Sequence, residues 1–464
     1  MSSPKQHSAL PSQEQLERLL NEQWSQEILP RLPEALEAQA RALGAFVRIR
    51  QLRTAADLLR GLLVYALCGL SFRGLGIWAV LTGIGCLSEK AWRKRLQRAE
   101  RWISWLLGTL IAMAQRPTWL PKGLTGTGIV LVDFSSIKVI GGTGDDVRLH
   151  LGYDLLAGRM DHVVVSDRHQ AESIPVEVVH RNWIYVSDSG YRQGYVATVI
   201  KQGGQVVVRR HGHDLRLEEE DGTVMEVRAQ AKGLEHGASK SLFGWIKLPG
   251  KGQRAYVRVI LTHLPNDQAI RARETKAAKA KAKGKQLKEE TLWWAEWVVI
   301  VTTLWEQDWP NALVLQLYRA RWQIELLFKR MKTFLQLHVL RWQQLERASL
   351  VVHLLLIGWA LYEQEAQVIR EVLQELATEP DQETSEPMAR ILSTWTLTAI
   401  GVQHLKQVVW GGWSEQRLYA CLPWLLRYFG QRRRKRGHQE TEIRAHLLAL
   451  TSPLWKSGKE LAVA

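Results

Sequence analysis

Four side chains of mixed charge are spaced three, four and seven residues apart in one short segment: Tyr318, Arg321, Glu325 and Lys332. At about 100° per residue, this spacing places them on one narrow helical face, which Lys329 joins. A stripe of this kind is often a solvated surface. Here the surrounding residues are largely apolar, which favours a stripe that faces a cleft. Glu325 can hold a hard divalent cation while the basic neighbours bind phosphates, as metal-assisted phosphoryl chemistry requires.

That chemistry needs further carboxylates, because acids from separate elements must hold two cations about 4 Å apart. Asp133 follows the apolar run Ile129–Val132, where an unpaired carboxylate would be costly to bury. Asp188 closes a second apolar run, Trp183–Val186. Asp167 also follows an apolar run and is the alternative for this second position. A turn or a helix cap is the ordinary role of any one aspartate in such a place.

The order Tyr-x2-Arg-x3-Glu-x6-Lys resembles the signature of bacterial cut-and-paste transposases of the insertion-sequence-four family. Asp133 in a first strand, Asp188 after a fourth and Glu325 on a later helix resemble the D-D-E triad of that family. The resemblance implies that these three residues bind two Mg²⁺ or Mn²⁺ ions. It also implies that the protein cleaves the ends of a DNA element through a hairpin and joins the freed 3′-hydroxyls to target DNA.

The resemblance further implies contacts with DNA outside the triad. Trp297 resembles a tryptophan that stacks on a base flipped from the duplex, and packing in the core beside Trp293 and Trp294 is the alternative. A strand-end arginine that contacts DNA in the family corresponds to Arg209, with Arg210 as the alternative. The residues expected to hold phosphates near the end of the element are Tyr318, Arg321, Lys329 and Lys332.

The elements that must position these residues follow from the hydrophobic pattern. Apolar residues recur at helical intervals up to about residue 118, short strands follow from Gly128, and the chain beyond Leu335 is helical again. The expected fold is α/β, an RNase H-like mixed sheet with a β-rich insertion, flanked by N- and C-terminal helical domains. The expected domains are 1–120 (helical, binding DNA ends), 121–214 (first part of the core), 215–295 (β-rich insertion with a basic loop), 296–345 (second part of the core) and 346–464 (helical).

The insertion combines candidate strands with a strongly basic segment. Arg271–Lys288 holds eight basic side chains against Glu274 alone. This composition predicts either a flexible basic loop or a helix that forms on DNA. The candidate strands before it are Val224–Val227, Gly244–Leu248 and Ala255–Leu261.

The net charge favours a polyanionic partner. Lys and Arg exceed Asp and Glu by 62 to 46, which gives +16 at pH 7. Double-stranded DNA is the expected partner, and an acidic membrane surface is the alternative. Ser88–Leu96 is typical of a capped helix with a basic first turn, continued by Arg98 and Arg101, and is a candidate to contact DNA.

Several protein classes are disfavoured. The uncharged apolar runs reach only about fifteen residues, short of the roughly twenty that span a bilayer. Met1–Leu20 lacks the apolar core of a signal peptide, so we expect a cytoplasmic protein that associates with the nucleoid when bound to DNA. Cys68, Cys86 and Cys421 are too few and too scattered for a disulfide framework or a zinc site.

Two rival functions stay open beside a transposase that pairs two DNA ends as a homodimer. A related metal-dependent nuclease would cleave DNA without strand transfer. A DNA-binding protein of transposon origin would lack catalysis, and its salt-sensitive binding would be unchanged when Asp133 or Glu325 is replaced.

Overall fold

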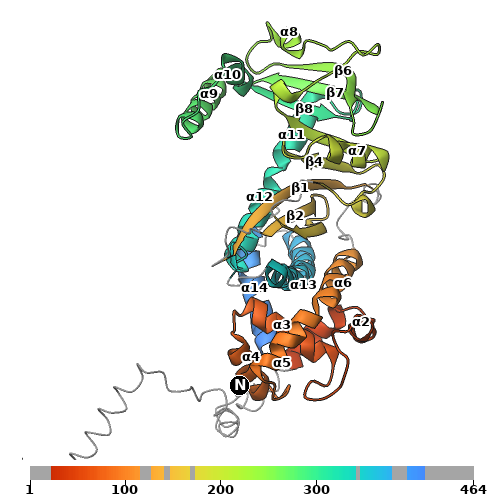
Figure 1. The fold of residues 1–464 in the computed structure, drawn as a ribbon, viewed down its shortest axis with the longest axis vertical. Helices are drawn as coiled ribbons and strands as arrows, with labels where there is room; N and C mark the ends of the chain where they lie inside the picture. Colours follow the sequence, from red (N-terminus) through yellow and green to blue (C-terminus); the bar gives the residue numbers. More distant parts are fainter. Residues whose placement is uncertain are drawn as a thin grey trace, which may run out of the picture.

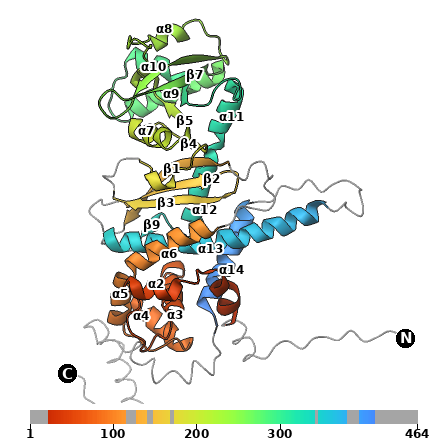
Figure 2. The same ribbon diagram turned by 90° about the vertical axis from the view of Figure 1, so that its right-hand side faces the viewer.

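The computed structural model describes most of the chain, and Figures 1 and 2 show an elongated molecule with a helical end, a central sheet and a β-rich end. The start of the chain, including Met1–Leu20, and the last part of the expected C-terminal domain lie outside the described residues. The described residues are 22–114, 127–139, 147–167, 173–340, 345–378 and 394–412.

Short capped helices form the N-terminal end, as the helical periodicity predicts. Thr54 forms a capping box with Asp57, and the hydroxyls of Ser71 and Ser88 accept hydrogen bonds from the first turns that follow them. These caps fix where three of the helices begin. The helices of this end are α2 (Leu36–Ala42), α3 (Ala55–Leu67), α4 (Phe72–Leu81), α5 (Glu89–Arg98) and α6 (Glu100–Met113).

The strands form one mixed sheet in the order β3-β2-β1-β4-β5-β8-β7-β6, with β9 (Val339–Leu340) paired to the far end of β1. β1 and β4 are parallel, as are β4 and β5, whereas the other pairs in this order are antiparallel. The mixed α/β sheet expected from the sequence is therefore confirmed. The strands are β1 (Ile129–Val139), β2 (Val147–Asp154), β3 (Arg159–Ser166), β4 (Ile184–Ser187), β5 (Gln205–Arg210), β6 (Ser239–Lys247), β7 (Arg254–His263) and β8 (Trp297–Thr302).

The β-rich insertion continues this sheet. β8 pairs with β5 on one side and with β7 on the other, so β6 and β7 extend the central sheet through β8. Val224–Val227 does not form the expected strand, because Val224 makes only a single bridge and Val227 begins the short helix α8 (Val227–Ala231). The chain turns away there after Met225, whose N–H donates to Leu217 O within a tight local loop.

A continuous apolar core joins the N-terminal helices to one face of the sheet. The helices α13 (Leu345–Thr378) and α14 (Thr394–Trp410) pack between them. Arg60 Nε donates to Val409 O at 2.9 Å, and Trp78 Nε1 donates to Trp410 O at 2.8 Å. The other face of the sheet packs against α7 (Gln193–Lys201) and the chain around α8 in a second core. The N-terminal end is thus fixed against the sheet.

Arg258 on β7 is a fully buried cation that links the sheet to α11 (Asn311–Ala320), the helix that follows β8. Its guanidinium donates to Trp309 O at 2.7 Å, Leu304 O at 3.2 Å and Ser241 Oγ at 3.1 Å. It also donates to Asn311 Oδ1 at the first residue of α11. These bonds fix the start of the segment that carries the charged stripe.

Candidate active site

Asp133 and Asp188 lie side by side on neighbouring strands. β1 pairs in parallel with β4, and Val132 lies opposite Ser187, so the two aspartates follow paired residues. Neighbouring strands are about 4.8 Å apart, which brings both carboxylates to one level of the sheet. Asp167, the alternative, ends β3, which is separated from β1 by β2. The geometry therefore favours Asp188 as the partner of Asp133.

The charged stripe lies on two nearly continuous helices where the sequence predicted one. α11 ends at Ala320 and α12 (Trp322–Phe334) follows at once. Arg321 between them keeps helical angles (φ −52°, ψ −28°), and its N–H donates to Tyr318 O three residues back. The interruption is thus one tightened turn, and Glu325 stays on the face of Arg321.

Arg321 joins this helix to the sheet. Its Nη1 donates to Asp133 Oδ2 at 2.8 Å, and its Nη2 donates to Glu325 Oε1 at 2.5 Å. The guanidinium lies 6.0 Å from the ring centre of Tyr318. The two aspartates and three residues of the stripe therefore meet at one place, although they come from widely separated parts of the sequence.

Burial and like charge raise the pKa of Asp133 to about 6. Burial is the largest cause, and the carboxylates of Asp188 and Glu325 raise the pKa further. A hydrogen bond from the Phe134 N–H and the charge of Arg321 act in the opposite direction. The three acids thus interact electrostatically, as a shared site requires.

Because its pKa is raised, Asp133 contributes less to the stability of the folded protein as the pH rises. The unfolded-state pKa of Asp133 is near 3.8, so between about pH 4 and pH 6 the native state binds more protons than the unfolded state. The contribution of Asp133 to the free energy of unfolding decreases across that window and decreases no further above it. Asp133→Asn should therefore stabilise the protein by about 1 to 3 kcal/mol at pH 7 and by nothing below pH 4. Urea unfolding at both pH values in EDTA measures this, with the exposed Asp308→Asn as control. An equal effect at both pH values would contradict it.

The carboxylates of Asp133, Asp188 and Glu325 are suitable ligands for a hard divalent cation. Their oxygens are not arranged around a common ion position in this structure. Across the described stretches of the chain, no three Asp, Glu, His or Cys side chains are placed to share an ion. Arg321 instead neutralises Asp133 and Glu325. Three carboxylates from two adjacent strands and a facing helix are nevertheless the oxygen ligands that Mg²⁺ and Mn²⁺ prefer. Asp133 Oδ2 and Glu325 Oε1 accept hydrogen bonds from Arg321, so a cation would compete with the guanidinium for these two oxygens.

The rest of the stripe is accessible. Tyr318 and Lys332 are partly exposed, and Lys329 is exposed, with its ammonium 5.9 Å from the ring centre of Trp395 on α14. Trp322, which directly follows Arg321, has 57% of its surface exposed.

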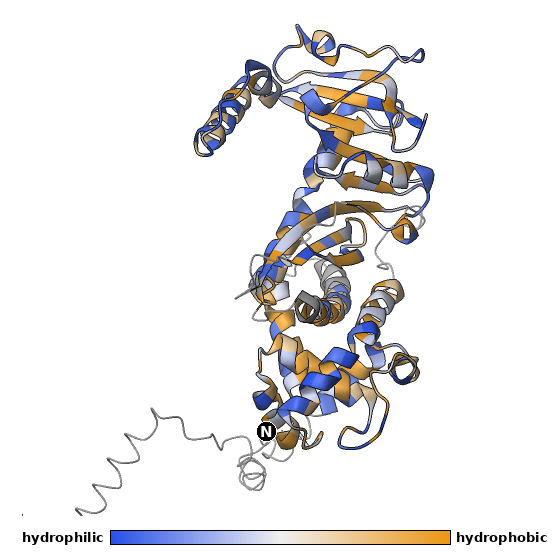
Figure 3. Cartoon of the chain, in the orientation of Figure 1, coloured by the Kyte–Doolittle hydropathy of each residue, from blue (hydrophilic) through white to orange (hydrophobic). Residues whose placement is uncertain are grey.

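Arg209, Arg210 and Trp297 line a different groove, of about 480 Å³, at the end of β5 and the start of β8. The opposite wall is α9 (Asn266–Lys281), a helix that projects from the β-rich end and buries only Ala269 and Ala280 (Figures 1 and 3). Most of the basic segment is therefore helical without DNA. No carboxylate lines the groove within the described chain. Its other cations, Arg271, Lys276 and Lys279, belong to the basic segment expected from the sequence, whereas the imidazoles of His211 and His213 were missed.

Trp297 itself is buried and packs on other aromatic rings. Its indole stacks on His263 at 4.3 Å and 7°, and Trp293 lies 5.0 Å away. Its Nε1 is buried and has no hydrogen-bond partner in the described chain. In this structure the Trp297 ring therefore packs in the core, as the alternative interpretation expects. Stacking on a base stays a prediction, and it requires the ring to be uncovered.

Comparison with known proteins identifies the family. A family model described as "Transposase DDE domain" matches residues 125–361, which contain Asp133, Asp188 and Glu325. The chain is 31% identical over 322 residues to "Putative transposase InsL for insertion sequence element IS186A" of Escherichia coli (strain K12), covering 68% of this chain and 86% of that protein. It is also 31% identical over 323 residues to "Transposase for insertion sequence element IS421" of Escherichia coli, with the same coverage. With its fold and its three converging carboxylates, the chain belongs to the family of DDE transposases.

Proposed function

We propose that this transposase hydrolyses the DNA at the ends of its own insertion element and joins the freed 3′-hydroxyls to target DNA. Asp133, Asp188 and Glu325 act as the metal ligands. The observation that carries the proposal is the convergence of two aspartates on adjacent parallel strands with a glutamate that Arg321 draws toward them.

The residues of the site divide into two roles. Bound Mg²⁺ or Mn²⁺, two ions in the proposal, supplies an activated water and positive charge for the leaving oxygen. The carboxylates hold this charge in place. Arg321 exchanges its carboxylate partners for a DNA phosphate, and Tyr318, Lys329 and Lys332 hold neighbouring phosphates. Arg321 thereby makes cation loading and DNA binding mutually favourable, since both remove the guanidinium from the acids.

Hairpin formation extends this proposal to the second groove. Attack of a 3′-hydroxyl on the opposite strand requires a sharply distorted duplex, and a flipped base beside Trp297 would lower the cost of that distortion. Arg209 and Arg210 at the end of β5 supply positive charge there, and α9 adds more. Trp297 Nε1 is buried without a partner in the described chain, so once the ring is uncovered it would become a donor for a base or a phosphate.

Two protomers are proposed to act together in the cytoplasm, on DNA of the nucleoid, because two ends must be held during one reaction. The described helices include none that is both long and apolar enough to cross a bilayer. End pairing by strictly monomeric protein, measured by light scattering of the DNA complex, would count against the dimer.

A cleavage assay tests the function. Purified protein is incubated with a labelled duplex carrying the element's own end, and with a target plasmid, in Mg²⁺ or EDTA. Nicks, hairpins and joined products should form only with Mg²⁺ and vanish in Asp188→Ala and Glu325→Ala. Cleaved but never joined ends would favour the nuclease, and binding without cleavage would favour the non-catalytic protein.

A further inference from the structure

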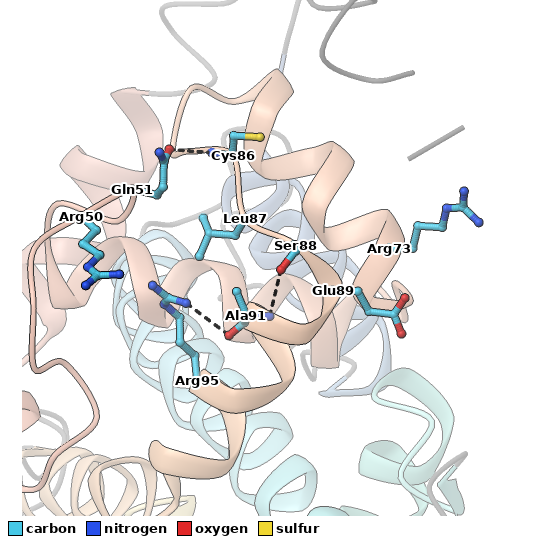
Figure 4. A pocket seen from close by; sticks show the side chains of 9 residues that line it. All are labelled: Arg50, Gln51, Arg73, Cys86, Leu87, Ser88, Glu89, Ala91 and Arg95. Carbon is cyan, nitrogen blue, oxygen red and sulfur yellow. Dashed lines mark hydrogen bonds between the residues drawn. The ribbon is translucent and has the colours of Figure 1, made fainter. Parts of the chain in front are cut away.

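The groove at Trp297 offers DNA more than positive charge. A pocket of about 610 Å³ among the N-terminal helices is lined by Arg50, Arg73 and Arg95, and no aromatic side chain of the described chain lines it (Figure 4). Its cations belong to the helices already expected to bind DNA ends. The groove, by contrast, holds the indoles of Trp294 and Trp297 among its cations. It therefore contains rings on which a base could stack.

One side of the Trp297 ring is held by the sheet. His263 on β7 is the direct cross-strand neighbour of Trp297, so both side chains lie on the same face of the sheet. The two rings are 4.3 Å apart at 7°, and His236 stacks on His263 at 3.9 Å. His263 Nδ1 also donates to Leu234 O at 2.8 Å. This stack of histidines is thus a fixed support for the indole.

A short helix, α10 (Glu289–Ala295), closes the ring from the side of β5. Its Trp293 lies 5.0 Å from the ring of Trp297 at 31°, a more tilted contact than the histidine stack. Its Trp294 packs over Gly212, just after β5, where a Cβ would overlap the indole. Because β5 and β7 flank β8 on opposite sides, α10 and the histidine stack approach the ring from opposite directions.

The helices α9 and α10 leave and rejoin the sheet at one place. The Leu264 N–H donates to Glu296 O at 2.9 Å, α9 begins just after Leu264, and α10 ends just before Glu296. Arg273 Nη1 of α9 donates to Glu296 Oε1 at 2.6 Å, and the two helices pack on each other and project from the β-rich end (Figure 1). We call them the α9–α10 arm. The arm can turn about the Leu264–Glu296 pair without breaking the pairing of β7 with β8.

The closed position of the α9–α10 arm leaves polar groups unsatisfied. The Nε1 atoms of Trp294 and Trp297 are both buried and have no hydrogen-bond partner in the described chain. A buried donor without a partner costs free energy, which opening of the arm to water or DNA would recover. Arg271 and Lys276 of α9 line the same groove and attract a polyanion to it. Both features favour opening of the arm when DNA enters.

We propose that the α9–α10 arm is a lid over Trp297, and that an unpaired base of the terminal DNA displaces Trp293 and stacks on the indole in its place. The base then continues the column formed by His236, His263 and Trp297. Trp293 is a positioning residue, because it sets how easily the ring is uncovered. This inference rests on the function proposed above, since it takes the terminal DNA as the ligand.

Affinity measurements on the full chain test the lid. Trp293→Ala should bind the terminal duplex about three- to tenfold more tightly than the wild type, because no ring has to be displaced before the base stacks. Gly212→Ala should act in the same direction, since its Cβ pushes Trp294 from its position. The matched controls should bind like the wild type. They are Trp305→Ala, at an exposed tryptophan outside the groove, and Gly194→Ala, where a Cβ meets no neighbouring atom.

A series of duplexes, each lacking one base near the cleaved bond, tests whether a base is the ligand. At one position the gain of Trp293→Ala over the wild type should disappear, because no base is left to compete for Trp297. The inference is overturned if Trp293→Ala binds the intact duplex no more tightly than the wild type does, or if the gain persists at every position.

Hydrogen exchange of the wild-type complexes is a second measurement that needs no variant. The amides of α10 should exchange faster in the complex with the intact end than in the complex with the abasic end, whereas those of β8 should not change. Equal exchange in α10 overturns the lid. Wild-type cleavage of the intact duplex in Mg²⁺ separates this result from failure of the proposed function. A wild type that neither binds nor cleaves its own end overturns both.

Discussion

Asp133→Asn is expected to lower metal-dependent cleavage of the element's end by about 10³-fold or more. Asparagine keeps the shape of the side chain but removes the charge that holds the cation against Asp188 and Glu325. A loss of several kcal/mol of transition-state stabilisation corresponds to this factor. Binding of the duplex should change less than threefold, because Arg321 keeps its charge and loses one competing partner. Single-turnover cleavage in Mg²⁺ and gel shifts in EDTA measure the two quantities.

The exposed Asp308→Asn is the control for charge and should cleave like the wild type. Asp167→Asn distinguishes the two candidates for the second aspartate and should have little effect, since β2 separates its strand from β1. Cleavage by Asp133→Asn within tenfold of the wild type would show that Asp133 serves only the structure of the strand.

Arg258→Met is expected to destabilise the fold by about 3 to 5 kcal/mol, the range found when one partner of a buried polar network is removed. Methionine fills much of the space but leaves Leu304 O, Trp309 O and Asn311 Oδ1 without their donor. Urea unfolding measures the loss. Arg254→Met, at the exposed start of the same strand, should cost less than about 1 kcal/mol. A similar cost for both variants would show that the buried network adds nothing.

The acidic site was the part of the molecule that could best be predicted from the sequence. The spacing of Tyr318, Arg321 and Glu325 fixes their shared helical face, and apolar runs mark the strands that carry Asp133 and Asp188. Local patterns of this kind depend only on neighbours in the chain. The contact of Arg321 with Asp133 could not be predicted in the same way, because the two residues lie 188 positions apart in the chain.

Other features depended on contacts that the sequence pattern does not record. The attachment of β6 and β7 to the central sheet depends on β8, which comes after both of them in the chain. The burial of Trp297 depends on His263, a residue of β7. Val224–Val227 has the apolar composition of a strand, but among the described residues its β pairing is limited to the single bridge between Val224 and Glu218.

The joint core of the N-terminal and C-terminal helices has a consequence for protein synthesis. The hydrogen bond from Arg60 Nε to Val409 O cannot form until the ribosome has synthesised the 349 residues that follow Arg60. Until α13 and α14 are synthesised, the parts of the apolar faces of α3 and α6 that pack against them stay uncovered. A stop codon upstream of α13 should therefore yield a fragment that exposes this apolar surface and aggregates, which a solubility measurement on the fragment would test.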